Sequence, residues 1–168
     1  MKTFSDYFGK TLHFVQPSIW KRAFELKDGE QVIGTLTYPK VFSIGVEVKI
    51  FDKKWEFYQP TWWKRLISIR EAGKELPFAS YKPLGFKKKT KLELPHGESV
   101  FLCSNFFKTT YEIQDRYESR LVLFKNKMSM KTKTEIQIEK RSELMDNYPW
   151  ILLLMLYVEL NSKKRRSS

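Results

Sequence analysis

The sequence predicts a mainly β fold: a closed antiparallel barrel of about twelve strands around a central, hydrophobic C-terminal helix. Three observations lead to this prediction. Apolar and polar residues alternate along most of the chain between Thr11 and Lys140, a pattern typical of strands with one buried face. Turn-forming sequences interrupt this alternation at short intervals. A long, unbroken apolar run follows the last alternating segment, at residues 148–160.

The alternating segments define the expected strands. Every second residue is apolar in SIGVEVKI (43–50), and MSMKTKTEIQIEK (128–140) has the same period with lysines and acids on its other face. The strands are expected at residues 11–15, 20–27, 30–37, 43–51, 53–59, 64–70, 75–82, 85–94, 98–104, 107–114, 119–126 and 129–140. Short strands at this spacing are typical of sandwiches and barrels.

Turn signals join these strands. They are KDGE (27–30), YPK (38–40), FDKK (51–54), EAGKE (71–75), KPLG (82–85), PHGE (95–98) and DRYES (115–119). Asp28-Gly29 favours a tight hairpin because both residues tolerate left-handed backbone conformations. No change of composition divides the chain, so residues 1–168 are predicted to form a single domain.

The run YPWILLLMLYVEL predicts a helix over about residues 147–161, followed by a basic tail at 162–168. Asp146 or Asn147 is the expected N-cap, and Pro149 falls in the first turn, where its missing N–H costs nothing. The run would be roughly 20 Å long, whereas a bilayer core is about 30 Å thick. A buried helix is therefore predicted in preference to a membrane anchor. The residues expected in its core are Trp150, Ile151, Leu152, Leu154, Met155 and Val158.

A barrel of about twelve strands needs such a helix. Side chains alone fill a barrel of about eight strands, and a wider barrel must flatten or be plugged. The strands must also bury their apolar faces against another element. The C-terminal helix is predicted to meet both requirements.

This arrangement resembles the tubby C-terminal-like superfamily, which includes tubby domains, plant LURP-one-related proteins and phospholipid scramblases. The resemblance covers about Thr11 to Asn161 and rests on the strand pattern, the helix YPWILLLMLYVEL and the opening stretch AFELKDGEQVIGTLTYPKVFSIGVEVKI. It implies a twelve-stranded barrel threaded by a hydrophobic helix. Tubby domains bind phosphoinositide head groups, so it also implies an anionic-lipid ligand. Scramblases carry an acidic calcium segment before the helix, but EKRSELMDNYPW lacks dense alternating acids, so the resemblance leaves calcium dependence open here.

Basic side chains are the main functional signal. The net charge is +12, which favours an anionic partner such as a membrane surface or nucleic acid, although it also keeps a protein soluble. Lysines gather on one face of two expected strands, where they either hold anionic lipid or only oppose aggregation. The candidate anion-binding residues are Lys87, Lys89, Lys91, Lys127, Lys131, Lys133, Trp62, Trp63, Lys64 and Arg65.

Two further basic or aromatic features allow two interpretations each. Trp62 and Trp63 are adjacent, so on a strand they would face opposite ways; they either touch a membrane interface or cap one end of the barrel. The final basic cluster KKRR either completes the helix end, where cations are favourable, or also contacts a membrane.

No catalytic or metal-binding constellation is visible in the sequence. His13 and His96 lack metal-site spacing, Cys103 is expected to be a wall or core residue, and there is no glycine-rich phosphate loop or nucleophile elbow. We therefore expect a non-enzymatic binding domain without cofactor or metal. With a single cysteine and no apolar leader, a cytoplasmic location is expected, with peripheral association with anionic, phosphoinositide-type membranes. The alternative functions are nucleic-acid binding and a protein-interaction scaffold.

Overall fold

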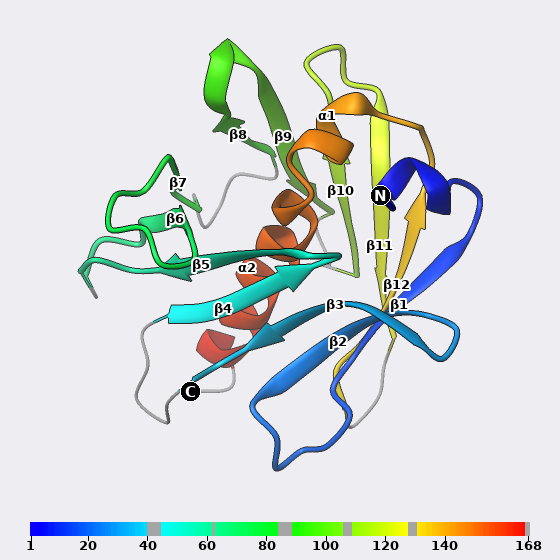
Figure 1. Cartoon of the computed structure of the whole chain (residues 1–168), viewed down its shortest axis with the longest axis horizontal. Coiled ribbons are helices and arrows are strands. Elements are labelled where there is room, and N and C mark those ends of the chain that lie inside the picture. Colours follow the sequence, from blue (N-terminus) through cyan, green and yellow to red (C-terminus); the bar gives the residue numbers. More distant parts are fainter. Residues whose placement is uncertain (40–44, 62, 84–88, 106–108, 128–130, 167–168) are drawn as a thin grey trace.

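The computed structural model describes residues 1–39, 45–61, 63–83, 89–105, 109–127 and 131–166. Within them the chain forms a twelve-stranded antiparallel sheet that curls around a C-terminal helix (Figure 1). The strands are β1 (Thr11–Val15), β2 (Ala23–Asp28), β3 (Gln31–Thr37), β4 (Gly45–Ile50), β5 (Lys53–Tyr58), β6 (Ile67–Glu71), β7 (Ala79–Tyr81), β8 (Lys89–Glu93), β9 (Ser99–Ser104), β10 (Thr110–Gln114), β11 (Arg120–Asn126) and β12 (Lys133–Ile138). The predicted mainly β fold is confirmed.

The order of the strands makes the sheet a nearly closed barrel. It runs β7-β6-β5-β4-β3-β2-β1-β12-β11-β10-β9-β8, so every hydrogen-bonded neighbour is consecutive in the chain except at the junction of β1 with β12. That junction pairs the first strand with the last, for example Phe14 with Thr134. β7 and β8 occupy the two ends of this order and also contact each other, which brings the edges of the sheet together.

Alternation along each strand places one row of side chains inside the barrel. In β4, Val46, Val48 and Ile50 are buried whereas Glu47 and Lys49 are exposed, as the sequence predicts. Each expected segment overlaps one observed strand, and the differences are at the ends: most strands are shorter than expected, whereas β2 and β6 extend one residue further, to Asp28 and Glu71. The first residues of the segments expected at 43–51, 107–114 and 129–140 lie outside the described residues. The first part of the segment expected at 85–94 lies outside the described residues, and β8 begins at Lys89.

Helix α2 (Trp150–Arg166) fills the barrel. None of the side chains from Trp150 to Tyr157 is more than 5% exposed, so this part of the helix is buried on every side. Phe57 of β5 contacts both Trp150 and Tyr157, with ring centroids 6.5 and 5.9 Å apart. The predicted buried helix is confirmed. Val158 is less buried than expected and only packs against the core, whereas Glu159 and Leu160 after it are 5% and 6% exposed, so one side of the helix is partly open to solvent at Val158.

The start and the end of the helix differ from the prediction. Asp146 and Asn147 do not cap it: they belong to a separate short helix, α1 (Glu143–Asn147), which is capped by Ser142. The basic residues after Asn161 are not a tail, because α2 continues through Arg166. Among the described residues, no helix combines the length and the apolar character needed to cross a bilayer.

An N-terminal turn that the alternation did not predict closes one end of the barrel. It is the 3-10 helix η1 (Phe4–Tyr7), whose two aromatic ends are buried and lie 5.3 and 6.1 Å from the ring of Phe51. The Ser5 hydroxyl and backbone N–H both donate to the Asp146 carboxylate, at 2.5 and 2.9 Å. Asp146 therefore ties the N-terminus to α1 instead of starting the main helix.

One glycine has a packing reason that the sequence alone does not show. A side chain on Gly45 of β4 would place its Cβ 2.8 Å from the Phe57 carbonyl oxygen on β5. Real Cβ atoms do not approach backbone oxygen this closely, so glycine permits β4 and β5 to pair along their full length beside the helix.

Truncating the centre of the helix should be costly. Leu153→Ala removes a side chain that is fully buried, so we expect the free energy of unfolding to fall by about 2–5 kcal/mol. Urea unfolding monitored by circular dichroism measures this change. The matched control is Leu76→Ala, the same substitution at a side chain that is 81% exposed, which should change the free energy by no more than about 0.5 kcal/mol. Equal effects of the two substitutions would show that α2 is not the core of the barrel.

Candidate functional site

The up-and-down topology sorts the connections between strands to two opposite ends of the barrel. The connections that follow β1, β3, β5, β7, β9 and β11 share one end, because successive strands are antiparallel. The C-terminus of α2 lies at this end too: Lys164 stacks on Tyr38, just after β3, and Glu159 bonds to Asn126, the last residue of β11. We call this end of the molecule the basic end, and the end where α2 begins the pocket end.

The two ends differ in charge. In the sequence, the six segments that connect strands at the basic end (16–22, 38–44, 59–66, 82–88, 105–109 and 127–132) contain no Asp or Glu, and neither do residues 160–168. By contrast, each of the five segments that connect strands at the pocket end (29–30, 51–52, 72–78, 94–98 and 115–119) contains at least one acid. The acids have been segregated away from one end of the barrel.

Exposed cations and exposed aromatic side chains gather at the basic end. Trp20 is 87% exposed and Trp63 is 64% exposed, and Ile19, next to Trp20, is 60% exposed. The exposed basic residues described at this end are Lys21, Arg22, Lys64, Arg65, Lys82, Lys127, Lys131, Lys133, Lys164 and Arg165. An aromatic side chain with an apolar body and a polar edge suits a boundary between water and lipid.

The structure brings together part of the predicted site. Trp63, Lys64 and Arg65 lie in the connection between β5 and β6, at the basic end. Lys127 and Lys131 lie in the connection between β11 and β12 at the same end, and Lys133 begins β12, although Lys127 also pairs with Glu135 at 3.3 Å. Lys87 and Trp62 lie outside the described residues.

The remaining two predicted lysines do not belong to this cluster. Lys89 reaches over the outer wall to the Glu118 carboxylate at 2.5 Å, and its Nζ lies 4.4 Å from the centroid of the Phe101 ring. Lys91 pairs with Glu93 of its own strand at 2.7 Å. Both cations are therefore held against acids on the side of the barrel, away from the cluster at the basic end.

Sequence reasoning missed the loop between β1 and β2, because the expected strand at 20–27 included Trp20. Ser18 organises this loop: its hydroxyl accepts from the Trp20 N–H at 3.3 Å, and its carbonyl accepts from the Lys21 N–H at 3.1 Å. Gln16 closes the loop by donating to the Lys21 carbonyl at 3.2 Å. The signal in the sequence was the turn former Pro17-Ser18 before an apolar pair and two bases, PSIWKR.

Two cations from separate elements meet at one aromatic ring. The Arg22 guanidinium lies 5.7 Å and the Lys164 Nζ lies 4.2 Å from the centroid of the Tyr38 ring. Partial burial of the ammonium group lowers the pKa of Lys164, and the nearby charge of Arg22 lowers it further. A bound anion would reduce the repulsion between these two charges, so the cluster is suited to an anionic group.

A buried polar network holds the end of α2 in place beneath this cluster. Glu159 is 5% exposed; its Oε1 accepts from Asn126 Nδ2 at 2.9 Å and lies 3.7 Å from Lys163 Nζ. Asn126 Oδ1 in turn accepts from the Thr134 hydroxyl at 2.9 Å. The helix is thereby bonded to β11 and, through Asn126, linked to β12, which keeps its basic last turn at the basic end.

Two side chains considered for catalysis, Cys103 and His96, lie in different environments. Cys103 is buried in β9, and burial raises the pKa of its thiol to about 11, so it is protonated at neutral pH. His96 is exposed in the turn η2 (Pro95–Gly97) between β8 and β9.

Comparison of the chain with protein-family models, with curated proteins and with solved structures gives no match. The functional argument therefore rests on the geometry of the chain itself.

The buried network generates a prediction. Asn126→Ala removes a hydrogen-bond donor from the buried Glu159 carboxylate, so we expect the free energy of unfolding to fall by about 1–3 kcal/mol. Asn147→Ala, at an exposed asparagine in α1, is the matched control and should change it by less than about 0.5 kcal/mol. Thermal or urea unfolding measures both. Equal free energies of unfolding for the two variants would mean that the network does not anchor the helix.

Proposed function

We propose that this protein is a non-enzymatic binding domain that docks its basic end on anionic membrane surfaces, including those that carry phosphoinositides. The segregation of charge carries the proposal: exposed cations and two exposed tryptophans share the end of the barrel whose connecting segments lack acids.

The energetics of this surface favour a membrane. Each Lys or Arg near an anionic bilayer contributes about 1 kcal/mol, and several contribute together when they lie at one end of a rigid body. Trp20 and Trp63 add apolar surface at the same end, and Trp is enriched at the level of the lipid head groups. Stable peripheral binding takes two signals, charge and apolar insertion, and the basic end offers both.

The architecture also supports the proposal by analogy. A twelve-stranded barrel that contains a C-terminal hydrophobic helix is what the resemblance to tubby-like proteins implies, and tubby domains bind phosphoinositides. Fold does not determine function, so this likeness adds to the charge distribution and does not replace it. Membership of the tubby-like group is part of the proposal.

Nucleic acid is the competing anionic partner. A single-stranded nucleic acid would stack its bases on aromatic side chains along a positive groove. At the basic end, the exposed side chains of Ile19 and Trp20 lie in the loop between β1 and β2. This position suits insertion into a bilayer better than stacking in a groove. An oligonucleotide that binds more tightly than vesicles at the same salt concentration would select the nucleic-acid function.

Charge reversal at the basic end should abolish vesicle binding. Lys64→Glu with Arg65→Glu replaces two attractive charges by two repulsive ones, so we expect affinity for phosphatidylserine or phosphoinositide vesicles to fall by about thirtyfold or more, equivalent to at least about 2 kcal/mol. Co-flotation with vesicles at low and physiological salt measures the change.

The matched control is Lys2→Glu with Arg116→Glu, which makes the same change in net charge with exposed residues outside the basic end. It should retain most of the binding. If both double variants lose binding equally, the net charge of the protein and not its basic end attracts the membrane. If the unaltered protein does not float with anionic vesicles at any salt concentration, the proposed function is wrong.

The exposed tryptophan should contribute separately from charge. Trp20→Ala leaves the net charge unchanged, so any loss of affinity comes from lost apolar insertion. The difference in affinity between this variant and the unaltered protein should therefore persist at high salt. We expect about tenfold weaker binding, corresponding to roughly 1.4 kcal/mol. Tyr117→Ala removes an aromatic side chain that is 73% exposed at the pocket end and is the control. Equal binding by the two variants would show that Trp20 does not enter the bilayer.

A further inference from the structure

Two cations at the basic end come from different elements of the fold and meet at the ring of Tyr38. Arg22 directly precedes β2, and Tyr38 directly follows β3. The Tyr38 N–H donates to the Arg22 carbonyl at 2.8 Å, one step beyond the last residue pair of these two strands, so the two residues are cross-strand neighbours. Lys164 reaches the same ring from the last turn of α2.

Arg22 ends a row of side chains that face the inside of the barrel. Phe24 and Leu36 pair with each other two residues further along β2 and β3, and both are buried. Because side chains alternate along a strand, Arg22 and Tyr38 belong to the same inner face. The Phe24 ring lies 6.5 Å from the Tyr38 ring. This inner row therefore ends in an exposed arginine where the barrel opens to solvent.

Helix α2 places the second cation with the same definition. The buried ring of Tyr157 lies 6.5 Å from the ring of Tyr38, and Lys164 follows Tyr157 by seven residues, which is two turns along one face of the helix. Lys163 belongs to another face, where it lies 3.7 Å from the buried Glu159 carboxylate. Lys164 is itself exposed, so a ligand can reach it as well as Arg22.

The surroundings of the Arg22–Lys164 pair leave two like charges close together. At Tyr58, by comparison, the stacked cation is Arg70, and the Glu56 carboxylate neutralises it at 2.6 Å. The segments around the Arg22–Lys164 pair, 16–22, 38–44 and 160–168, contain no Asp or Glu. An anion that contacts both cations would therefore supply the missing opposite charge and remove their repulsion.

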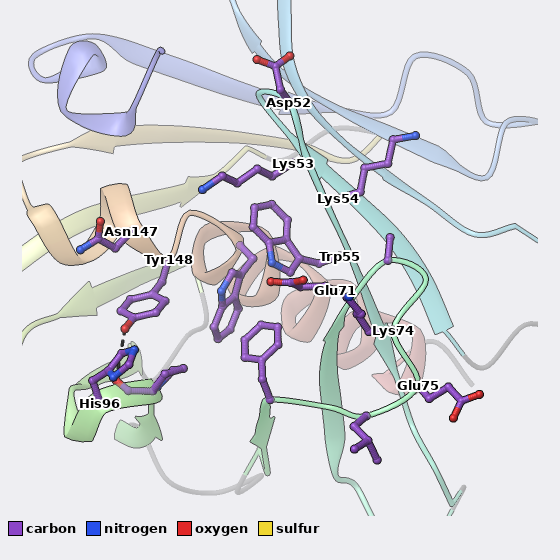
Figure 2. A pocket seen from close by; sticks show the side chains of 15 residues that line it. Asp52, Lys53, Lys54, Trp55, Glu71, Lys74, Glu75, His96, Asn147 and Tyr148 are labelled. Atoms are coloured by element: carbon purple, nitrogen blue, oxygen red, sulfur yellow. Dashed lines mark hydrogen bonds between the residues drawn. The ribbon is translucent and has the colours of Figure 1, made fainter.

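The opposite end of the barrel has no equivalent concentration of positive charge. It contains an open pocket of about 1090 Å³, and Figure 2 shows acidic and basic side chains around it. The charged residues among those that line it are Asp52, Lys53, Lys54, Glu71, Lys74 and Glu75. Charges of both signs are interspersed there, so an anion would meet carboxylates as well as ammonium groups. The basic end is therefore the better place for an anionic ligand.

The two cations differ in the geometry that they offer. A guanidinium can donate two parallel N–H bonds to two oxygens of one phosphate, whereas an ammonium acts as a compact point charge. A phosphomonoester has three unesterified oxygens and a charge of about −1.5 to −2 at pH 7, so one such group can engage both cations. A phosphodiester or a carboxylate has two such oxygens and one negative charge, and it would satisfy the pair less well.

We propose that Arg22 and Lys164 together bind the phosphomonoester group of a membrane lipid. The Arg22 guanidinium donates to two of the phosphate oxygens, and the Lys164 ammonium pairs with the third. This assignment rests on the proposed membrane contact and deepens it, because docking then depends on one kind of head group as well as on surface charge. A lipid is favoured over a soluble phosphate because the exposed Trp20 lies two residues before Arg22, so insertion of the indole brings this cation to the head groups.

Flotation of the full chain with two kinds of vesicle tests the assignment. Phosphatidic acid ends in a phosphomonoester, whereas phosphatidylserine carries a phosphodiester. Vesicles with about 10 mol% phosphatidic acid and vesicles with about 20 mol% phosphatidylserine, both in phosphatidylcholine, have similar total charge. We expect about tenfold tighter binding to the phosphatidic acid vesicles. Equal affinities would overturn the phosphomonoester assignment but leave the membrane function standing, whereas no flotation with either vesicle would overturn both.

A pair of double variants locates the preference. Arg22→Gln with Lys164→Gln should bind phosphatidic acid vesicles about tenfold more weakly and lose the preference for them. Lys64→Gln with Arg65→Gln removes the same two charges from the same end and is the control: it should weaken binding to both vesicles by a similar factor and keep the preference. If the two double variants keep the preference equally, or lose it equally, Arg22 and Lys164 do not form the site. Circular dichroism checks that both variants are folded, and the preference of the unaltered protein is measured without them.

Inorganic phosphate distinguishes a lipid from a soluble source of the same group. In a titration of the full chain without vesicles, followed by the backbone amide signals of Arg22 and Lys164, we expect no saturation below about 1 mM phosphate, because insertion of Trp20 then contributes nothing. Saturation at about 10 μM or below would assign the Arg22–Lys164 pair to a soluble phosphate compound and overturn the lipid assignment.

Discussion

The width of a twelve-stranded barrel is the constraint on which this structure depends. Strand side chains alone cannot reach across it, so the apolar face of the sheet needs a second element to cover it. Helix α2 supplies that element, with eight consecutive side chains at its start nearly excluded from solvent. The helix has no polar face because it has no solvent-facing side in this stretch. An apolar run of this length is therefore explained by the sheet around it and not by a bilayer.

The same helix connects the two ends of the barrel, which differ in their charge. It enters at the pocket end, where Trp150 lies against Phe78, and it reaches the basic end, where Lys164 lies against Tyr38. The buried bond between Asn126 and Glu159 holds its last turns in position. Because strands alternate in direction, every connecting segment belongs to one end or the other. Acids that are confined to the connections of one end in the sequence are therefore confined to one end of the barrel in space, and the two ends present different surfaces.

The sequence was sufficient to predict the strands and the central helix, but not which residues lie together on the surface of the protein. Alternation such as that in β4 and the unbroken run after Pro149 each report burial directly, so the strands and the helix could be placed. The short turn η1 has no period to detect, and its role depends on Asp146, far away in the chain. Lys89 and Lys131 look alike in the sequence, yet one bonds to an acid on the wall and the other lies at the basic end. Which strand ends share a surface follows only from the topology.

Amide hydrogen exchange of the full chain, free and on anionic vesicles, tests the central claim most directly. The amides of residues 151–157 should exchange only through global unfolding in both states, because they lie inside the barrel. On vesicles, the loop at residues 16–22 and the helix end at residues 163–166 should become protected while the β6–β7 connection does not change. Rapid exchange at residues 151–157 in the free protein would contradict the claim that α2 is the core of the barrel. Equal protection of the basic end and the pocket end on vesicles would contradict the claim that the two ends present different surfaces and that only the basic end contacts the membrane.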